Sequence, residues 1–172
     1  MSETYQRLIP TDPAYVPPPE AQEKAVAALR EIIGEDVMVR AIVTEDIQFV
    51  DQGANFQHVS CPKCAVKLAG WWGRAMDAAY ATKFVDLMTT CPACKAAVSL
   101  NELDYDWPAG FARFKLEADG KRGQRHVGDL KLGDVSVSVV EVKVNPGWLT
   151  DSQRQQLEAI LGCKLREIWS HY

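Results

Sequence analysis

Two Cys-Pro-x-Cys motifs constrain the fold of this chain more than any other feature of its sequence. The first holds Cys61 and Cys64, the second holds Cys91 and Cys94, and 26 residues separate them. The two-residue spacing lets one tight turn present both sulfurs to a single ion, and the proline stiffens that turn. Two such turns supply four thiolates, so the sequence predicts one structural zinc ion held by these cysteines.

The stretch between the motifs predicts a helix. Its large apolar residues recur every three or four positions, as the inward stripe of a helix does: Trp72, Met76, Tyr80, Phe84 and Leu87. Residues 59–98 resemble the paired Cys-Pro-x-Cys knuckles of zinc-ribbon proteins, with a longer, helical spacer. The resemblance implies a structural four-cysteine zinc site in a small fold, and it extends no further along the chain.

Other uses of the cysteines stay open from the sequence. A thiol-disulfide redox protein also uses Cys-x-x-Cys, but a second motif is then unexplained. An iron centre of the rubredoxin type has the same four ligands, so the ion is zinc or iron. A catalytic zinc ion needs an open coordination position, which four cysteines fill. His58 is a candidate replacement ligand, although a surface role is favoured, and Cys163 is expected to be a buried thiol.

Composition and charge narrow the class of protein. The chain of 172 residues is 47% hydrophobic and 24% charged, which is typical of a globular protein. Its formal net charge of -4 does not favour a role in neutralising phosphates. The first residues lack the basic and apolar regions of a signal peptide, and no apolar run reaches the roughly 20 residues that span a bilayer. We therefore expect a cytoplasmic protein without membrane contact, in which five cysteines favour a metal over disulfides.

Hydrophobic periodicity predicts a mixture of short helices and strands. Helices are expected at residues 20–33, before Gly34, and from a Thr150–Gln153 capping box to Leu161, before Gly162. Strands are expected at residues 37–43, 46–51, 56–59, 110–118, 134–144 and 163–172. This order predicts an α+β fold: an antiparallel sheet with helices packed on one face, plus a zinc-tied helical insert at about residues 60–98.

Residues 1–19 contain five prolines. Because proline fixes φ and lacks an N–H donor, we expect an extended, Pro-rich segment that forms neither a helix nor a central strand. Residues 20–172 are then predicted to form a single α+β domain that contains the insert.

The segments around Gly34 and Gly162 align with each other, each as a helix, a glycine and a strand. The alignment fits a decayed duplication, but it also fits any amphipathic helix that ends in glycine before a strand. Because only one short unit aligns, the second explanation is favoured.

An acidic, aromatic loop is the first candidate binding surface. It contains Asp104, Tyr105, Asp106 and Trp107. Aromatic residues are enriched in protein interfaces, which would make the partner another protein. A plain loop anchored to the core by Trp107 is the simpler alternative.

Two groups of basic residues are candidate phosphate or nucleic-acid contacts. Lys63, Lys67 and Arg74 belong to the cysteine module, residues 61–98, whose formal charge is +3. A glycine-rich connection contributes the second group: Lys121, Arg122 and Arg125. Nucleic-acid binding would also need aromatic rings for stacking, and the aromatic stripe is expected to face inward.

The sequence contains none of the familiar catalytic motifs for which it was searched. The sequence has no Gly-x-Ser-x-Gly, no Walker loop, no His-Glu-x-x-His and no dinucleotide fingerprint. The leading prediction is a non-catalytic, cytoplasmic binding or adaptor protein with a structural zinc site of four cysteines. A nucleic-acid-associated zinc-ribbon-like protein and a thiol-disulfide redox protein are the alternatives.

Overall fold

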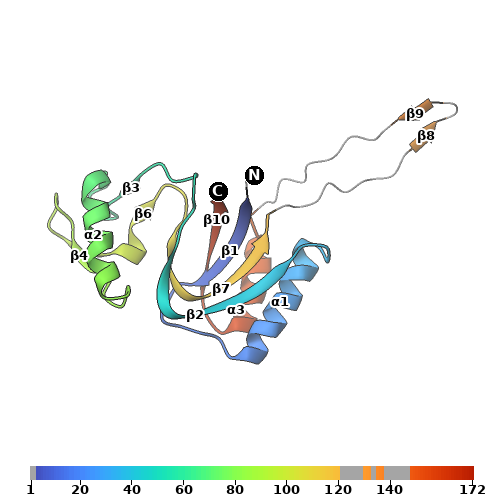
Figure 1. Ribbon diagram of the computed structural model, residues 1–172, viewed down its shortest axis with the longest axis horizontal. Helices are drawn as coiled ribbons and strands as arrows, with labels where there is room; N and C mark the ends of the chain where they lie inside the picture. The colour runs from blue at the N-terminus through green and yellow to red at the C-terminus, as the bar shows by residue number, and fades with distance from the viewer. Residues whose placement is uncertain (1–2, 121–129, 133–134, 138–147) are drawn as a thin grey trace.

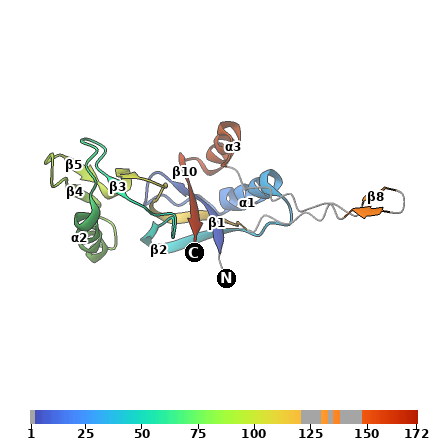
Figure 2. The same cartoon turned by 90° about the horizontal axis from the view of Figure 1, so that it is seen from above.

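The main element of the protein is a four-stranded antiparallel sheet. The computed structural model describes residues 3–120, 130–132, 135–137 and 148–172. The sheet order is β10-β1-β7-β2, with β1 (Thr4–Pro10), β2 (Val39–Val50), β7 (Gly110–Asp119) and β10 (Leu165–His171) (Figure 1). Helices α1 (Pro19–Ile33) and α3 (Asp151–Leu161) pack together on one face of the sheet (Figure 2). The predicted α+β class is confirmed.

The sheet is built from two β-α-β units that have the same connectivity. β1 and β2 run in the same direction with β7 between them, and α1 connects them. β7 and β10 are arranged in the same way around β1, with α3 in their connection. Two interleaved β-α-β units of this kind form the split β-α-β, or ferredoxin-like, arrangement. The aligned segments around Gly34 and Gly162 therefore occupy matching places in the two units.

A buried apolar core lies between the sheet and its two helices. Successive side chains of a strand face opposite sides, so alternate residues of each strand point toward the helices. Leu8, Phe114 and Leu116 meet Leu29 of α1 and Leu157 of α3, and all five are fully buried. Burying one such side chain contributes about 2 kcal/mol, so this core is a main contribution to the packing of the helices on the sheet.

One prediction about the N-terminal segment is wrong, because β1 is an inner strand of the sheet. It pairs with β10 along Thr4–Pro10 and with β7 along Tyr5–Leu8. The prolines do not interfere, since Pro10 ends the strand and the others follow it. Every position before Pro10 therefore keeps the N–H group that a central strand needs. Beyond β1, residues 11–18 form an irregular connection to α1.

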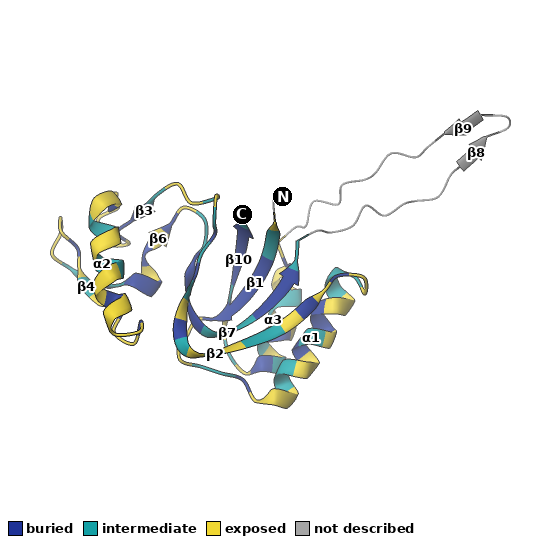
Figure 3. Cartoon of the chain, viewed as in Figure 1, coloured by how far each residue is buried: buried dark blue, intermediate teal, exposed yellow. Residues whose placement is uncertain are grey.

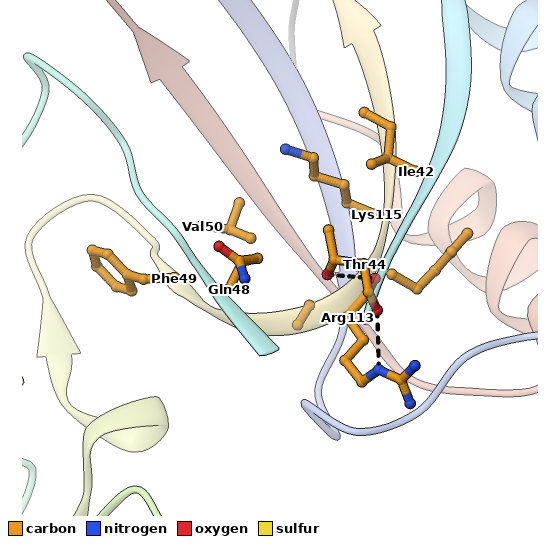
Figure 4. A pocket seen from close by; sticks show the side chains of 9 residues that line it. Ile42, Thr44, Gln48, Phe49, Val50, Arg113 and Lys115 are labelled. Carbon is orange, nitrogen blue, oxygen red and sulfur yellow. Dashed lines mark hydrogen bonds between the residues drawn. The ribbon is translucent and has the colours of Figure 1, made fainter. Parts of the chain in front are cut away.

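A second difference concerns the predicted strands 37–43 and 46–51, which form one strand, β2. Its register against β7 shifts between Val43 and Gln48. The Thr44 hydroxyl donates to the backbone oxygen of Arg113, whose guanidinium donates to the backbone oxygen of Thr44 (Figure 4). These bonds stabilise the bulge. The cavity beside it has a volume of about 40 Å³, which has room for a few water molecules and is too small for a substrate.

The predicted ends of α1 and α3 are confirmed to within one residue. At the start of α3, the N–H of Gln153 donates to the Thr150 hydroxyl, and the N–H of Thr150 donates to the Gln153 side chain. Gly162 ends α3 with a φ of 72°, a conformation that glycine adopts without steric cost.

The connection between β2 and β7, residues 51–109, lies beside one end of the sheet and is called the insert here (Figure 1). Two small ladders form in it, because β3 pairs with β6 and β4 pairs with β5. Its apolar core includes Val59, Leu68 and Leu100, and it reaches Phe111 of β7. The elements of the insert are β3 (Val59–Ser60), α2 (Ala69–Ala81), β4 (Met88–Thr90), β5 (Ala97–Ser99), the 3-10 turn η1 (Leu100–Glu102) and β6 (Asp104–Tyr105).

The second half of the chain contains one more short ladder, between β8 (Leu130–Leu132) and β9 (Val135–Val137). The predicted strand 134–144 overlaps β9, and its other residues lie outside the described part of the chain. Among the described helices, none has the length and the apolar composition that crossing a bilayer requires.

The sheet face opposite the helices carries a charged network. Glu117 is 4% exposed and accepts hydrogen bonds from Arg7 and Arg40. Arg7 also lies over the rings of Tyr5 and Tyr172. Burial alone would raise the pKa of Glu117, but the two guanidinium groups lower it overall. Because its folded-state pKa is lowered, Glu117 stabilises the fold at neutral pH, and that contribution is lost as the pH falls through this pKa.

Candidate metal centre

The four motif cysteines meet in the insert and could hold one metal ion. The Sγ atoms of Cys61, Cys64, Cys91 and Cys94 all lie within 4.8 Å of one another. Across the motifs, Cys61 and Cys94 are 3.9 Å apart, and Cys64 and Cys91 are 3.8 Å apart. A tetrahedron with zinc–sulfur bonds of about 2.3 Å has edges of about 3.8 Å. The sulfurs therefore already have the spacing that one ion needs, and they are too far apart for disulfides, whose length is about 2 Å.

Both motifs form the same backbone turn. In the first, the N–H of Ala65 donates to the Cys61 oxygen at 2.9 Å, and the N–H of Cys61 donates to the Val66 oxygen at 3.0 Å. The second motif repeats the two bonds through Cys91, at 3.1 and 2.9 Å. The residue after each motif, Ala65 or Lys95, has a φ of 60°. This left-handed residue reverses the chain directly after the second cysteine and completes the turn.

The four thiols differ in exposure, and the pKa values of Cys91 and Cys64 are shifted in opposite directions. Cys61 and Cys91 are buried, whereas Cys64 and Cys94 are exposed. The backbone N–H of Cys94 is the main cause that lowers the pKa of Cys91 to about 6. The N–H of Val66 acts in the same direction on Cys64, but desolvation and the three neighbouring thiols raise its pKa to about 11. Close thiolates repel one another, so a bound cation is what allows all four to ionise.

Four thiolates complete the shell of a tetrahedral ion. Within the described residues, the group contains these four cysteines alone. His58, the candidate replacement ligand, lies 3.8 Å from the Asp106 carboxylate. No coordination position remains for water or substrate, so the arrangement suits an ion that ties the two turns together.

α2 lies between the cysteine motifs, as predicted, but its apolar stripe is only partly buried. Phe84 and Leu87, which follow the helix, are buried, and Trp72 is half-buried. Tyr80 was expected to face inward and is 72% exposed, while Ala79 takes the inward position. The reason is that α2 contacts the rest of the insert along one narrow side, and most of its surface is exposed to solvent (Figure 3).

Trp72 belongs to an aromatic cluster that joins the insert to β2. Its ring stacks on Phe56 at 5.3 Å and packs against Phe49 and Tyr105 at 6.0 and 6.3 Å. The indole N–H donates to the Tyr105 hydroxyl, which donates to the Leu100 oxygen. Burial raises the pKa of Tyr105 to about 12. Tyr105, a predicted partner-binding residue, is therefore buried among other protein groups.

The rest of the predicted partner-binding loop lies at the surface. Asp104 and Asp106 are exposed, and Trp107 is half-buried. The ring of Trp107 lies 6.2 Å from that of Trp148, which is 49% exposed and meets the buried Trp169 edge-on. Sequence reasoning missed Trp148 because it stands alone beside a turn, with no pattern that relates it to Trp107.

Only one of the two groups of predicted basic contacts lies in the described part of the chain. Lys63, Lys67 and Arg74 are all exposed on the insert. The second group lies outside the described residues: Lys121, Arg122 and Arg125.

Cys163, expected to be buried, is half-buried just beyond α3. Burial, with help from Glu158 and Asp12, raises the pKa of this thiol to about 11. The protonated thiol is a weak nucleophile at neutral pH.

Comparisons of the chain with protein-family models, with curated proteins and with solved structures find no match. The function must therefore be argued from the residues of this chain.

Proposed function

We propose that this protein binds another protein and that its four cysteines hold one structural zinc ion. The observation that carries the proposal is the pair of the half-buried Trp107 and the exposed Trp148, because Trp107 lies in a loop with two exposed carboxylates, Asp104 and Asp106. Tryptophan is among the residues that contribute most to binding energy in protein interfaces. We call these four residues the aromatic surface.

The aromatic surface is held in place before a partner arrives. Trp148 packs against Trp169, whose indole N–H donates to Glu167 at 3.2 Å. The same carboxylate accepts a hydrogen bond from the N–H of Leu149 at 3.1 Å. A ring that is already ordered loses little side-chain entropy on binding, which favours affinity.

The metal supports this role without taking part in chemistry. Four thiolates leave no open position on a tetrahedral ion. Zinc is the ion that closed sites of four cysteines characteristically hold, and its binding free energy contributes to the folding of small modules. A cytoplasmic location, as expected from the sequence, belongs to the same proposal, because a reducing compartment keeps cysteines available as metal ligands.

The two alternative functions receive less support from the geometry. Tyr105 is buried and Trp72 is half-buried against other rings, so these two rings offer little free face for base stacking beside the exposed Lys63, Lys67 and Arg74. A redox protein needs an accessible, reactive thiolate, and thiolates that share a metal ion are protected from such reactions.

Metal analysis and thiol counting test the proposed zinc site. We expect one zinc ion per folded chain and four thiols that become reactive only after a chelator removes the ion. If the analysis found iron, the proposed identity of the ion would be wrong, but its structural role would be retained. A metal-free folded chain with a reactive Cys61 would contradict the proposal.

Substitution of the tryptophans tests the aromatic surface. After a partner has been captured with the full chain and purified, we expect Trp107→Ala/Trp148→Ala to weaken its binding by at least about tenfold. The control is Met38→Ala, which removes another exposed apolar side chain (63% exposed) and should leave the affinity unchanged. Equal affinity of both variants and the unchanged chain would contradict the proposed surface.

A further inference from the structure

A groove lies where the N-terminal connection meets the insert. We call it the junction groove, and its volume is about 440 Å³. One wall is formed by residues 11–14, between β1 and α1. Another is formed by residues 84–88, which run from the α2–β4 connection to Met88, the first residue of β4. The lining is completed by Ile47, Ser99, Asn101 and Glu102. The groove shares no residue with the aromatic surface.

Hydrogen bonds fix both walls of the junction groove. The buried side chain of Asn101 donates to the backbone oxygen of Thr11 at 3.0 Å. On the other wall, the N–H of Met88 donates to the Asp86 carboxylate at 3.0 Å. Because the groove is already formed, an occupant loses little free energy to ordering the protein around it.

The junction groove exposes apolar surface to solvent. Val85 is 77% exposed and Met88 is 60% exposed. Between them in the chain, Leu87 is buried in the insert core together with Phe84 and Ile47. Covering the exposed valine and methionine would remove apolar area from water, and methionine adapts its shape to different occupants.

The charge of the junction groove is negative. Asp12, Asp86 and Glu102 are exposed, and no lysine, arginine or histidine is among the described residues that line the groove. Two basic residues beside the lining have partners of their own. Lys83 pairs with Asp46 at 3.0 Å, and Arg166, which is close enough to Glu102 to interact with its charge, donates to the Asn101 side chain at 3.1 Å and to the Ala109 oxygen at 2.8 Å. Three carboxylates without a lining cation attract basic groups and repel phosphates and acidic peptides.

We infer that the junction groove binds a basic peptide segment of another protein. An apolar side chain of that segment contacts Val85 and Met88, and lysine or arginine side chains on either side of it meet the three carboxylates. The apolar walls favour such a segment over a fully polar cation, and the negative rim disfavours nucleic acid. The inference goes beyond the proposed aromatic surface and does not depend on it.

Binding of defined peptides to the full, zinc-loaded chain tests the inference. The probes are fluorescent heptapeptides with a central leucine, isoleucine, methionine or phenylalanine between lysine or arginine residues, and a matched set with glutamate in place of the basic residues. By fluorescence anisotropy, we expect binding of basic peptides that weakens with added salt, and no binding of the acidic set. Failure of every basic peptide, or equal binding of both sets, would overturn the inference.

Variants of exposed lining residues then locate the binding site. Glu102→Lys and Val85→Ser should each lower the affinity for the basic peptide by about three- to tenfold. This is the effect expected from changing a charge at the rim of a site or removing a partly buried apolar contact. The matched controls are Glu31→Lys on α1 and Met38→Ser before β2, both at exposed positions, and they should leave binding unchanged.

The competing occupants give different results. If the control variants lost peptide binding to the same extent as the groove variants, the inference would be overturned. It would also be overturned if the chain did not bind peptide and instead self-associated in a manner that Val85→Ser abolishes. Trp107→Ala/Trp148→Ala should leave peptide binding intact. Failure of the aromatic surface and failure of the junction groove are therefore separate outcomes.

Discussion

At the scale of single residues, the two cysteine turns contain a conformation that glycine would adopt more easily. Ala65 and Lys95 both have a φ of 60°. For residues with a side chain, the left-handed region costs about 1–2 kcal/mol. The turns require it, because the N–H of each residue must reach the oxygen of the first cysteine in its motif.

Ala65→Gly is therefore expected to stabilise the metal-loaded protein. Relief of the left-handed conformation exceeds the added chain entropy of glycine, so the free energy of unfolding should rise by about 0.5–1 kcal/mol in urea denaturation. The control is Ala93→Gly in the second turn, because Ala93 has no positive φ. This variant should lose about 0.5–1 kcal/mol, and a loss of the same size in both variants would contradict the explanation.

At the scale of secondary structure, the first turn of α3 depends on its cap. The first N–H groups of a helix have no partner within the helix. At α3, the Thr150 hydroxyl accepts from Gln153, and the Gln153 side chain accepts from Thr150. Because α3 covers the sheet through Leu157 and Leu161, weakening its start also weakens the main core.

Thr150→Ala should lower the free energy of unfolding by about 1 kcal/mol, since it leaves the N–H of Gln153 without its partner. The midpoint of urea denaturation should fall while its slope stays the same. Ser152→Ala provides the control, because Ser152 is exposed in the same turn and does not cap the helix. Equal losses of stability in the two variants would contradict the capping explanation, because alanine has a higher helix propensity than serine and Ser152→Ala should lose none.

Strands illustrate the limits of local reasoning at this scale. The alternation of residues 110–118 predicts β7 well, because a strand with one face on a core repeats every two residues. The same reasoning divided β2 in two, since the bulge after Val43 interrupts its alternation. The predicted absence of a central strand in residues 1–19 is wrong for a positional reason, because Pro10 is the last residue of β1 and the other prolines follow it.

At the scale of the whole molecule, the described residues form two main buried cores. The core between the sheet and its helices contains Leu8, Leu29 and Leu116, and the core of the insert contains Leu68 and Leu100. The two share no buried residue, although β7 contributes Phe114 to the first and Phe111 to the second. The four cysteines belong to the insert, so loss of the metal ion that we propose they hold should affect one core more than the other.

Removal of the metal is expected to open the insert and leave the sheet folded. In hydrogen exchange with a chelator, protection should fall across residues 59–99 and persist in β1, β7 and the two helices that cover them. Restoring zinc should restore protection, and Cys94→Ser should resemble the chelated protein. Loss of protection throughout the chain would contradict the separation of the two cores.

The sequence by itself determined the features that have a local cause. The two-residue spacing in each motif predicted the ligand group, because one turn places both sulfurs on the same side. Thr150, Gln153 and Gly162 predicted the limits of α3, because a helix end is specified by the residues that satisfy its terminal groups. Together with the helix and strand periodicities, these signals predicted the α+β class.

Only the tertiary structure decided which distant segments meet. The sheet order, the contact of Trp107 with Trp148, and the junction groove between residues 11–14 and 84–88 join parts of the chain that no periodicity relates. The exposure of Tyr80 and the burial of Tyr105 were decided in the same way. The physical reason is that burial depends on what packs against a side chain, and that neighbour is usually remote in sequence.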